Sequence, residues 1–157
     1  MHLSSRADIE APIDYVFASL SDFEGWERAA MRRGADVSRI DKLRAQGIGM
    51  AWRVRFRFRG KDRDLEIKLT GMDRDAQLAF VGKGRMLVGD LSMDLVALAP
   101  RRTRLVMHVD VRPLTIGARL FLQSMKLAKG RIQTKLNQRL GQLSADIEAR
   151  YAITRPR

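Results

Sequence analysis

The chain has 157 residues, 45% apolar residues and a formal net charge of +12, so we expect one basic domain over residues 1–157. It has no cysteine, which excludes disulfides, thiol catalysis and cysteine-based zinc sites. It has only two histidines, which argues against a multi-histidine metal site within one chain. No metal site or cofactor is therefore predicted. Neither a signal peptide nor an apolar run of the ~20 residues needed to span a membrane is visible, and we expect a cytoplasmic protein.

The first third of the chain predicts a strand followed by two short helices. Residues 3–9 alternate between apolar and polar side chains, as a half-buried strand does. Residues 13–20 fit a helix, and a second helix capped by Ser21 or Asp22 continues to about residue 33, where Gly34 ends it. A weakly patterned strand follows near residues 37–40.

The clearest alternation in the chain predicts a β-hairpin. Residues 50–59 place Met, Trp, Val and Phe on one face and mostly Arg on the other, and residues 64–69 alternate in the same way. Gly60-Lys61 between them suits a two-residue type II′ turn. That turn predicts Phe56 opposite Leu65 and Arg57 opposite Asp64.

The remaining chain predicts three more strands and then a long helix. Alternating apolar residues mark strands around 78–80, 91–97 and 105–111. From about residue 115 to residue 151 the apolar period becomes helical, which indicates one long amphipathic helix with a possible bend at Gly130. Because that apolar stripe must be buried, we expect an α+β fold in which a curved antiparallel sheet of about seven strands surrounds the long helix.

The opening segment resembles a known superfamily. An apolar strand, Ala11-Pro12, a helix containing Val16-Phe17, and then Asp22 and Trp26 look like the start of the polyketide cyclase/dehydrase and lipid-transport (START-like, SRPBCC) superfamily. The resemblance implies a helix-grip fold, with the sheet clasping a C-terminal helix around an apolar cavity. It also implies a small hydrophobic or amphipathic ligand, such as a lipid, a quinone or a polyketide-like molecule.

The candidate ligand-binding residues are apolar side chains expected to face this cavity or its mouth. Most alternate onto the apolar face of the strands or lie on the predicted helical stripe, and two in the second short helix are candidates for the mouth. The set is Trp26, Met31, Trp52, Val54, Phe56, Ile67, Leu69, Phe80, Met93, Met107, Phe121 and Met125. The alternative interpretation of these residues is a filled core.

Two other classes of function remain open from the sequence. A cyclase or dehydrase of the same fold needs a polar pair in the cavity, but His108 is predicted to face outward, beside solvent, Asp94 or Asp110. A basic interaction module would use the positive charge, with an anionic membrane surface favoured over nucleic acid because the aromatic residues alternate onto the buried face. Gly82-Lys83-Gly84 is interpreted as a turn or bulge between strands rather than a phosphate-binding loop.

Overall fold

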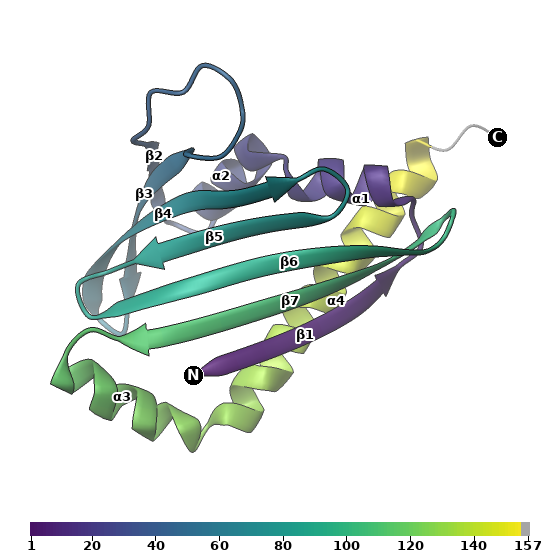
Figure 1. The fold of residues 1–157 in the computed structure, drawn as a ribbon. Coiled ribbons are helices and arrows are strands. Elements are labelled where there is room, and N and C mark those ends of the chain that lie inside the picture. The colour runs from purple at the N-terminus through teal and green to yellow at the C-terminus, as the bar shows by residue number, and fades with distance from the viewer. Residues whose placement is uncertain (155–157) are drawn as a thin grey trace.

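The computed structural model describes residues 1–154 and is built on one antiparallel sheet of seven strands (Figure 1). The strands are β1 (His2–Ile9), β2 (Asp36–Arg39), β3 (Ala51–Phe58), β4 (Lys61–Asp73), β5 (Gln77–Lys83), β6 (Leu87–Ala99) and β7 (Arg102–Pro113). Their order across the sheet is β1-β7-β6-β5-β4-β3-β2, so β1 joins β7 and β2 forms the other edge. The helices are α1 (Ile13–Leu20), α2 (Phe23–Arg32), α3 (Ile116–Lys126) and α4 (Lys129–Thr154). The expected α+β helix-grip architecture is confirmed.

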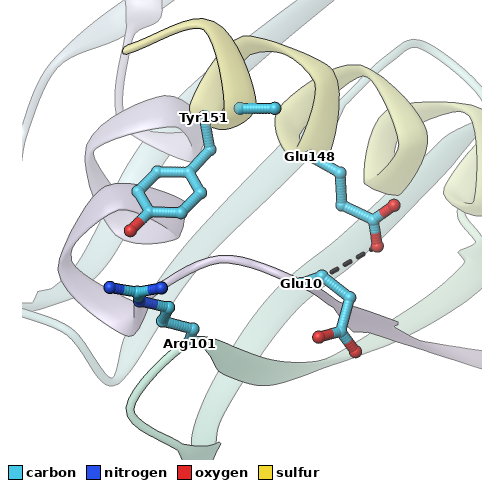
Figure 2. Close-up of a pocket in the computed structure, with 5 residues that line it drawn as sticks. Glu10, Arg101, Glu148 and Tyr151 are labelled. Carbon is cyan, nitrogen blue, oxygen red and sulfur yellow. Dashed lines mark hydrogen bonds between the residues drawn. The ribbon is translucent and has the colours of Figure 1, made fainter. Parts of the chain in front are cut away.

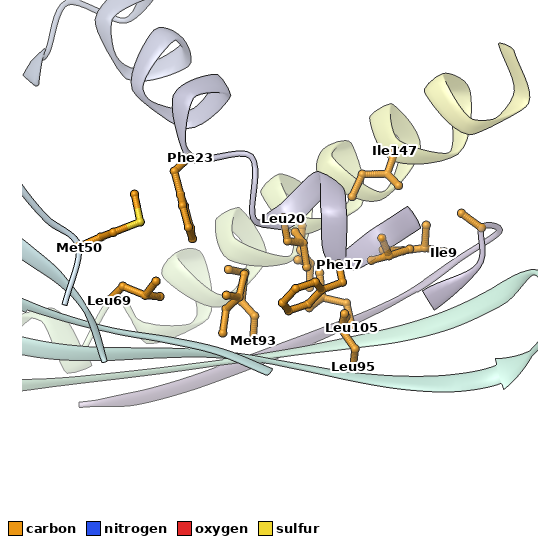
Figure 3. Close-up of a cluster of buried hydrophobic side chains, with 14 of the residues drawn as sticks. Ile9, Phe17, Leu20, Phe23, Met50, Leu69, Met93, Leu95, Leu105 and Ile147 are labelled. Carbon is orange, nitrogen blue, oxygen red and sulfur yellow. The ribbon is translucent and has the colours of Figure 1, made fainter. Parts of the chain in front are cut away.

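The helices pack on one face of the sheet, which we call the inner face. The fully buried side chains Ile9, Leu69 and Leu105 belong to it, and they meet Leu140 and Ile147 of α4. Figure 3 shows side chains of α1 and α4 packing down onto those of the strands. The other face, the outer face, carries the alternating charged residues, as the strand pattern predicts.

The two short helices have the expected positions. Asp22 caps α2, because its carboxylate accepts a hydrogen bond from the Gly25 N–H at 3.2 Å. The Trp26 indole N–H donates to the carbonyl of Leu20 at 2.9 Å, which ties α2 to the end of α1.

The predicted hairpin exists, but its predicted register is wrong by two residues. Phe56 lies opposite Arg63, and Arg57 lies opposite Asp62. The turn is centred on Arg59 and Gly60, whose φ angles of 53° and 74° are both positive, as a type I′ turn requires. Type I′ and type II′ turns both match the twist of the flanking strands, but the expected type II′ turn has Gly60 as its first central residue, and here Arg59 takes that place. A shift of two residues leaves every side chain on its predicted face.

The predicted long helix is in fact two helices, and the break precedes Gly130. The N–H groups of Leu127 and Ala128 donate to carbonyls three residues earlier, Ser124 and Met125, which tightens and ends α3. The two helices follow different strands, since α3 packs mainly on β7 and α4 mainly on β1. The chain turns between α3 and α4, so the two helices run in different directions (Figure 1).

Within residues 1–154, no helix combines the length and the apolar character that crossing a membrane requires.

Candidate functional site

The inner face is tightly packed at one end of the sheet and, on β3 to β7, less completely covered at the other. We call the end with the β3–β4 and β5–β6 turns and the β7–α3 link the α3 end, and the end with the β4–β5 and β6–β7 turns the far end. Near the far end, Ile9 and Leu105 are completely buried. Toward the α3 end, Val54, Ile67 and Val109 on the same face are only half-buried. Apolar side chains of the inner face are therefore left incompletely covered at the α3 end.

Two glycines that face each other across neighbouring strands lie in this less covered region. Gly82 of β5 pairs with Gly89 of β6, and Gly82 also pairs with Ile67 of β4. A Cβ atom placed on Gly82 would meet nothing closer than the Ile67 Cγ1 atom at 4.0 Å, whereas one on Gly89 would lie 3.4 Å from the Asp110 carbonyl oxygen and 3.8 Å from Val111 Cγ2. We call this place, where the inner face lacks side chains, the glycine hollow.

Apolar side chains border the glycine hollow on every strand that reaches it. The borders are Ile67 of β4, Phe80 of β5, Leu91 of β6 and Val111 of β7. All four are half-buried. The surface around the hollow is thus apolar and incompletely covered, as a binding site for an apolar molecule is.

The helices leave this part of the inner face with little cover. α4 packs mainly on β1, α1 on β6 and β7, and α2 on β2. At the α3 end, the Arg59 guanidinium lies over the rings of Phe58 and Phe121, 5.4 and 5.5 Å from their centroids. Arg59 therefore links the β3–β4 turn to α3 and bounds the open region on that side.

Three basic side chains alternate onto the inner face: Arg39 of β2, which lies over the Trp52 ring, and Lys61 and Arg63 of β4. Arg63 lies opposite Phe56 and alternates on β4 with Leu65 and Ile67. Its Nε atom is enclosed and has no hydrogen-bond partner among the described residues. Among those residues, no carboxylate lies within ion-pair distance of it either. Arg63 therefore provides a positive charge without a protein partner beside an apolar surface.

The structure separates the twelve predicted ligand-binding residues into three groups. Trp52, Leu69 and Met93 are buried in the core. Half-buried on the inner face or on α3 are Val54, Phe56, Ile67, Phe80, Met107, Phe121 and Met125. Trp26 and Met31 lie on the exposed surface of α2, 42% and 49% exposed.

Aromatic packing and hydrogen bonds hold α2 against the edge of the sheet. The rings of Phe23, Trp52 and Phe80 lie within 6.5 Å of one another. The Trp52 indole N–H donates to Glu27 Oε1 at 2.7 Å. Trp52 and Glu27 are thus already hydrogen-bonded to each other, and we assign them a structural role.

Asp41 organises the loop between β2 and β3. The Arg39 guanidinium donates two hydrogen bonds of 2.6 Å to its carboxylate, and the Ala51 N–H donates another of 2.8 Å. These hydrogen bonds hold the pKa of Asp41 far below its ordinary value of 3.8. The bonds from Arg39 have the largest effect, and the bond from Ala51 has the next largest. Asp41 is therefore ionised in the folded protein and fixes this loop.

The outer face carries ion pairs rather than a catalytic constellation. His108 Nε2 lies 3.8 Å from Asp94 Oδ2, on the outer face as predicted. The Arg104 guanidinium donates to Asp8, and this hydrogen bond lowers the pKa of the Asp8 carboxyl. The His108–Asp94 pair lies across the sheet from the glycine hollow and does not face it.

A separate hollow of about 410 Å³ lies at the far end, between β1, the β6–β7 turn and the end of α4 (Figure 2). It is lined by Glu10, Arg101, Glu148, Tyr151 and Ala152. The Glu148 carboxylate accepts a hydrogen bond from the Glu10 N–H at 3.0 Å, which fastens α4 to the end of β1. We therefore interpret this hollow as part of the contact that attaches α4 to the end of β1, and not as a ligand site.

Five residues of the candidate site were not among the predicted ligand-binding residues: Arg63, Gly82, Gly89, Leu91 and Val111. Gly82 was interpreted as part of a turn, but it lies inside β5. Gly89 and Arg63 carried no assignment, although the alternation of Arg63 with Leu65 and Ile67 was a usable signal. The glycine pair has no comparable signal, because it depends on the register between β5 and β6.

Comparison with known proteins identifies the fold. No protein-family model and no curated protein matches the sequence. Among solved structures, the chain is similar to the Zhui aromatase/cyclase from Streptomyces sp. R1128, with a TM-score of 0.68 and 15% identity over 96% of this chain and 94% of that chain. It is also similar to a START superfamily protein from Mycobacterium smegmatis, with a TM-score of 0.63 and 14% identity over 98% and 99% of the two chains.

A third similar structure is the Aha1 dimer from Colwellia psychrerythraea, with a TM-score of 0.60 and 18% identity over 94% of this chain and 96% of that chain. At these identities the similarity is one of fold. The START-like, SRPBCC fold implied by the opening segment is confirmed.

Proposed function

We propose that this protein binds a small hydrophobic or amphipathic molecule, of the lipid, quinone or polyketide type, against the inner face at the α3 end. The observation that carries the proposal is the glycine hollow, an inner-face site without side chains between half-buried apolar residues. Burial of ligand surface against Ile67, Phe80 and Leu91 supplies the affinity, because removing apolar area from water is favourable by about 25 cal/mol per Å².

Arg63 gives the proposed site its preference for an acidic ligand. Its guanidinium stands on the inner face without a carboxylate partner among the described residues. An acid group on the ligand would provide that partner, while the apolar part of the ligand extends toward Gly82 and Gly89. The predicted ligand is therefore an amphipathic acid, with a hydrocarbon or ring portion and one anionic end.

The placement of the titratable groups favours binding over catalysis. A cyclase or dehydrase needs acid and base groups facing the ligand. The candidate general base from the sequence, His108, points to the outer face beside Asp94. The carboxylate of Glu27, near the aromatic cluster, already accepts a hydrogen bond from the Trp52 indole N–H.

The experiment compares a fluorescent fatty acid with its methyl ester, which has the same apolar part and no charge. We expect the wild-type protein to bind both probes, and the acid more tightly. Arg63→Gln should weaken binding of the acid about tenfold, since hydrogen bonds to charged groups contribute ~1.5–3 kcal/mol, and leave the ester unchanged. Lys68→Gln, on the outer face of the same strand, is the matched control and should change neither affinity.

Two results would contradict the proposal. Failure of both the acid and the ester to bind would reject a ligand site on the inner face. Equal weakening by Arg63→Gln and Lys68→Gln would show that only the net charge of the protein matters, and would remove the role of Arg63.

A further inference from the structure

The segment that forms α3 and the first half of α4 contains only positive charges. Between Asp110 and Asp146 the chain has no Asp or Glu. Its basic residues are Arg112, Arg119, Lys126, Lys129, Arg131, Lys135 and Arg139. Arg112 is neutralised by Asp90 and Asp110 of the sheet. Within residues 1–154, the other six have no carboxylate within ion-pair distance.

The same segment exposes large apolar side chains to solvent. Leu127, at the link between α3 and α4, is 92% exposed, and Ile116 and Leu120 of α3 are 80% and 61% exposed. These residues are spaced by four and seven positions, so they align on one side of the helix. Ala118 and Leu122, on the opposite side, are buried against the protein. Helix α3 thus has a second apolar face that packs against nothing in this chain.

Cations lie directly beside this exposed apolar face. Arg119 and Lys126 are placed along its edge by the helical spacing, and Lys126 and Lys129 flank Leu127 and Ala128 at the link. Just beyond, Arg131 and Lys135 line a shallow hollow of about 570 Å³ on α4. We call Ile116, Leu120 and Leu127, with Arg119, Lys126 and Lys129, the α3 docking face.

The outer face of the sheet, although rich in arginine, has a different character. Arg53 pairs with Glu66 at 3.0 Å, and Arg55 pairs with Asp64 at 3.4 Å. Charges paired in this way contribute little to attraction at a distance. The free positive charge and the exposed apolar surface therefore coincide on the α3 docking face.

We infer that the α3 docking face binds the surface of an anionic lipid membrane. An apolar helix face edged by lysine and arginine lies in the interface of a bilayer, with the apolar side chains below the headgroups and the cations among the phosphates. A nucleic acid would match the cations but leave Ile116, Leu120 and Leu127 in water. A second copy of this chain would bring the same unpaired cations together and repel itself.

This inference goes beyond ligand binding and does not require it. Where the proposed function also holds, docking has a consequence for the ligand. The α3 docking face lies at the same end of the sheet as the opening beside Arg59 and Phe121 (Figure 1). A docked molecule would therefore present this opening toward the membrane, where an amphipathic acid would be taken up or released.

Vesicle co-sedimentation tests the docking. We compare vesicles of phosphatidylcholine alone with vesicles of phosphatidylcholine and phosphatidylglycerol, using the whole protein without added ligand. We expect binding to the anionic vesicles only. Lys126→Glu with Lys129→Glu should reduce partitioning by more than about 30-fold at low salt, because losing each cation costs about fivefold and each new carboxylate adds repulsion. This loss should shrink as salt rises, since the Debye length falls to ~8 Å at physiological ionic strength.

The apolar contribution has its own variant and both variants have matched controls. Leu120→Ser with Leu127→Ser should reduce partitioning about tenfold at every salt concentration, because apolar burial is not screened. Val96→Ser with Leu98→Ser removes exposed apolar side chains elsewhere, 54% and 42% exposed, and should have no effect. Arg74→Glu with Arg101→Glu reverses two exposed cations in the turns of the far end and should have a small effect.

Three results would overturn the inference. Equal losses from the two charge-reversed pairs would assign binding to the net charge of the whole protein. Binding of a single-stranded RNA that depends on Lys126 and Lys129 but not on Leu120 and Leu127 would make the face a polyanion site. A dimer of the wild-type protein that Leu120→Ser with Leu127→Ser dissociates would make it an interface between copies. Ligand binding is measured separately with the fatty-acid assay, so the membrane-docking proposal and the ligand-binding proposal can be refuted independently.

Discussion

Filling the glycine hollow from inside is the most direct test of where a ligand binds. Gly82 has an ordinary strand conformation, and a Cβ atom on it would meet only Ile67 Cγ1, at 4.0 Å. Gly82→Leu should therefore be accepted by the fold. Because glycine within a strand is less favourable than alanine by roughly 0.5–1 kcal/mol, the variant should unfold at the same temperature as the wild type or slightly higher.

The expected loss of ligand binding follows from the volume that the leucine occupies. The side chain adds four carbon atoms at the place where the ligand would lie. If they displace an equal amount of ligand from apolar contact, at ~0.8 kcal/mol per CH₂ group, the loss is about 3 kcal/mol. At about 1.4 kcal/mol for each tenfold change, the dissociation constant should rise by about two orders of magnitude.

The assay is titration of the fluorescent fatty acid and its methyl ester, with thermal unfolding of the same samples. Gly141→Leu, which adds the same side chain at an exposed position on α4 with nothing within 4 Å, is the matched control. Both probes should lose affinity in Gly82→Leu and neither in Gly141→Leu. Undiminished binding by a stably folded Gly82→Leu would place the ligand elsewhere, and a large drop in unfolding temperature would show that the hollow is already filled.

Two further predictions concern stability. Asp41→Asn should lower the midpoint of thermal unfolding at about pH 7. Because the pKa of Asp41 is depressed in the folded state, its contribution to stability is complete above the unfolded value of 3.8 and is lost as pH falls through the folded pKa. Circular dichroism should therefore show the midpoints of the variant and the wild type converging in acid, and a difference that stays constant with pH would contradict this account. Gly60→Val should destabilise the protein by about 1–2 kcal/mol in urea unfolding, because a β-branched residue resists the φ of +74° at this position. The control Lys61→Val, at the next residue, should have little effect. Equal losses of stability in the two variants would argue against a turn that requires positive φ at Gly60.

The order of the elements and the face of each strand could be predicted from the sequence, because both depend on local periodicity. The alternation from Trp52 to Phe58 assigns faces whatever the neighbouring strand does. Register depends on the turn as well. The pattern fits two registers that differ by two residues, and the conformation of Arg59 decides between them. The register error changed the partner of Phe56 from Leu65 to Arg63, but it left the face of Arg63 unchanged, so alternation alone could have placed Arg63 on the inner face.

The helix break and the glycine hollow could not be predicted, because each depends on contacts between distant segments. A helical stripe from Ala118 to Ile147 continues through the link at Leu127, and periodicity alone does not distinguish a bent path from a straight one. Gly82 and Gly89 meet only because β5 and β6 pair in one particular register. From the sequence alone, Gly82 was interpreted as part of a turn or bulge, and Gly89 carried no assignment.

The two features that the sequence did not predict have a common physical effect. The glycine pair removes side chains from the inner face, and the break at Leu127 takes α3 away from the line of α4, which would otherwise continue along the sheet. Both reduce the covering of the same end of the inner face. At the far end, by contrast, Ile9, Leu105 and Ile147 are fully buried, so the packing that holds the fold together does not depend on the α3 end. Because the packed core and the less covered region lie at opposite ends of the sheet, the α3 end can expose apolar surface, the unpaired Arg63 and a second helix face without weakening the core. Both proposed activities are therefore placed at the α3 end.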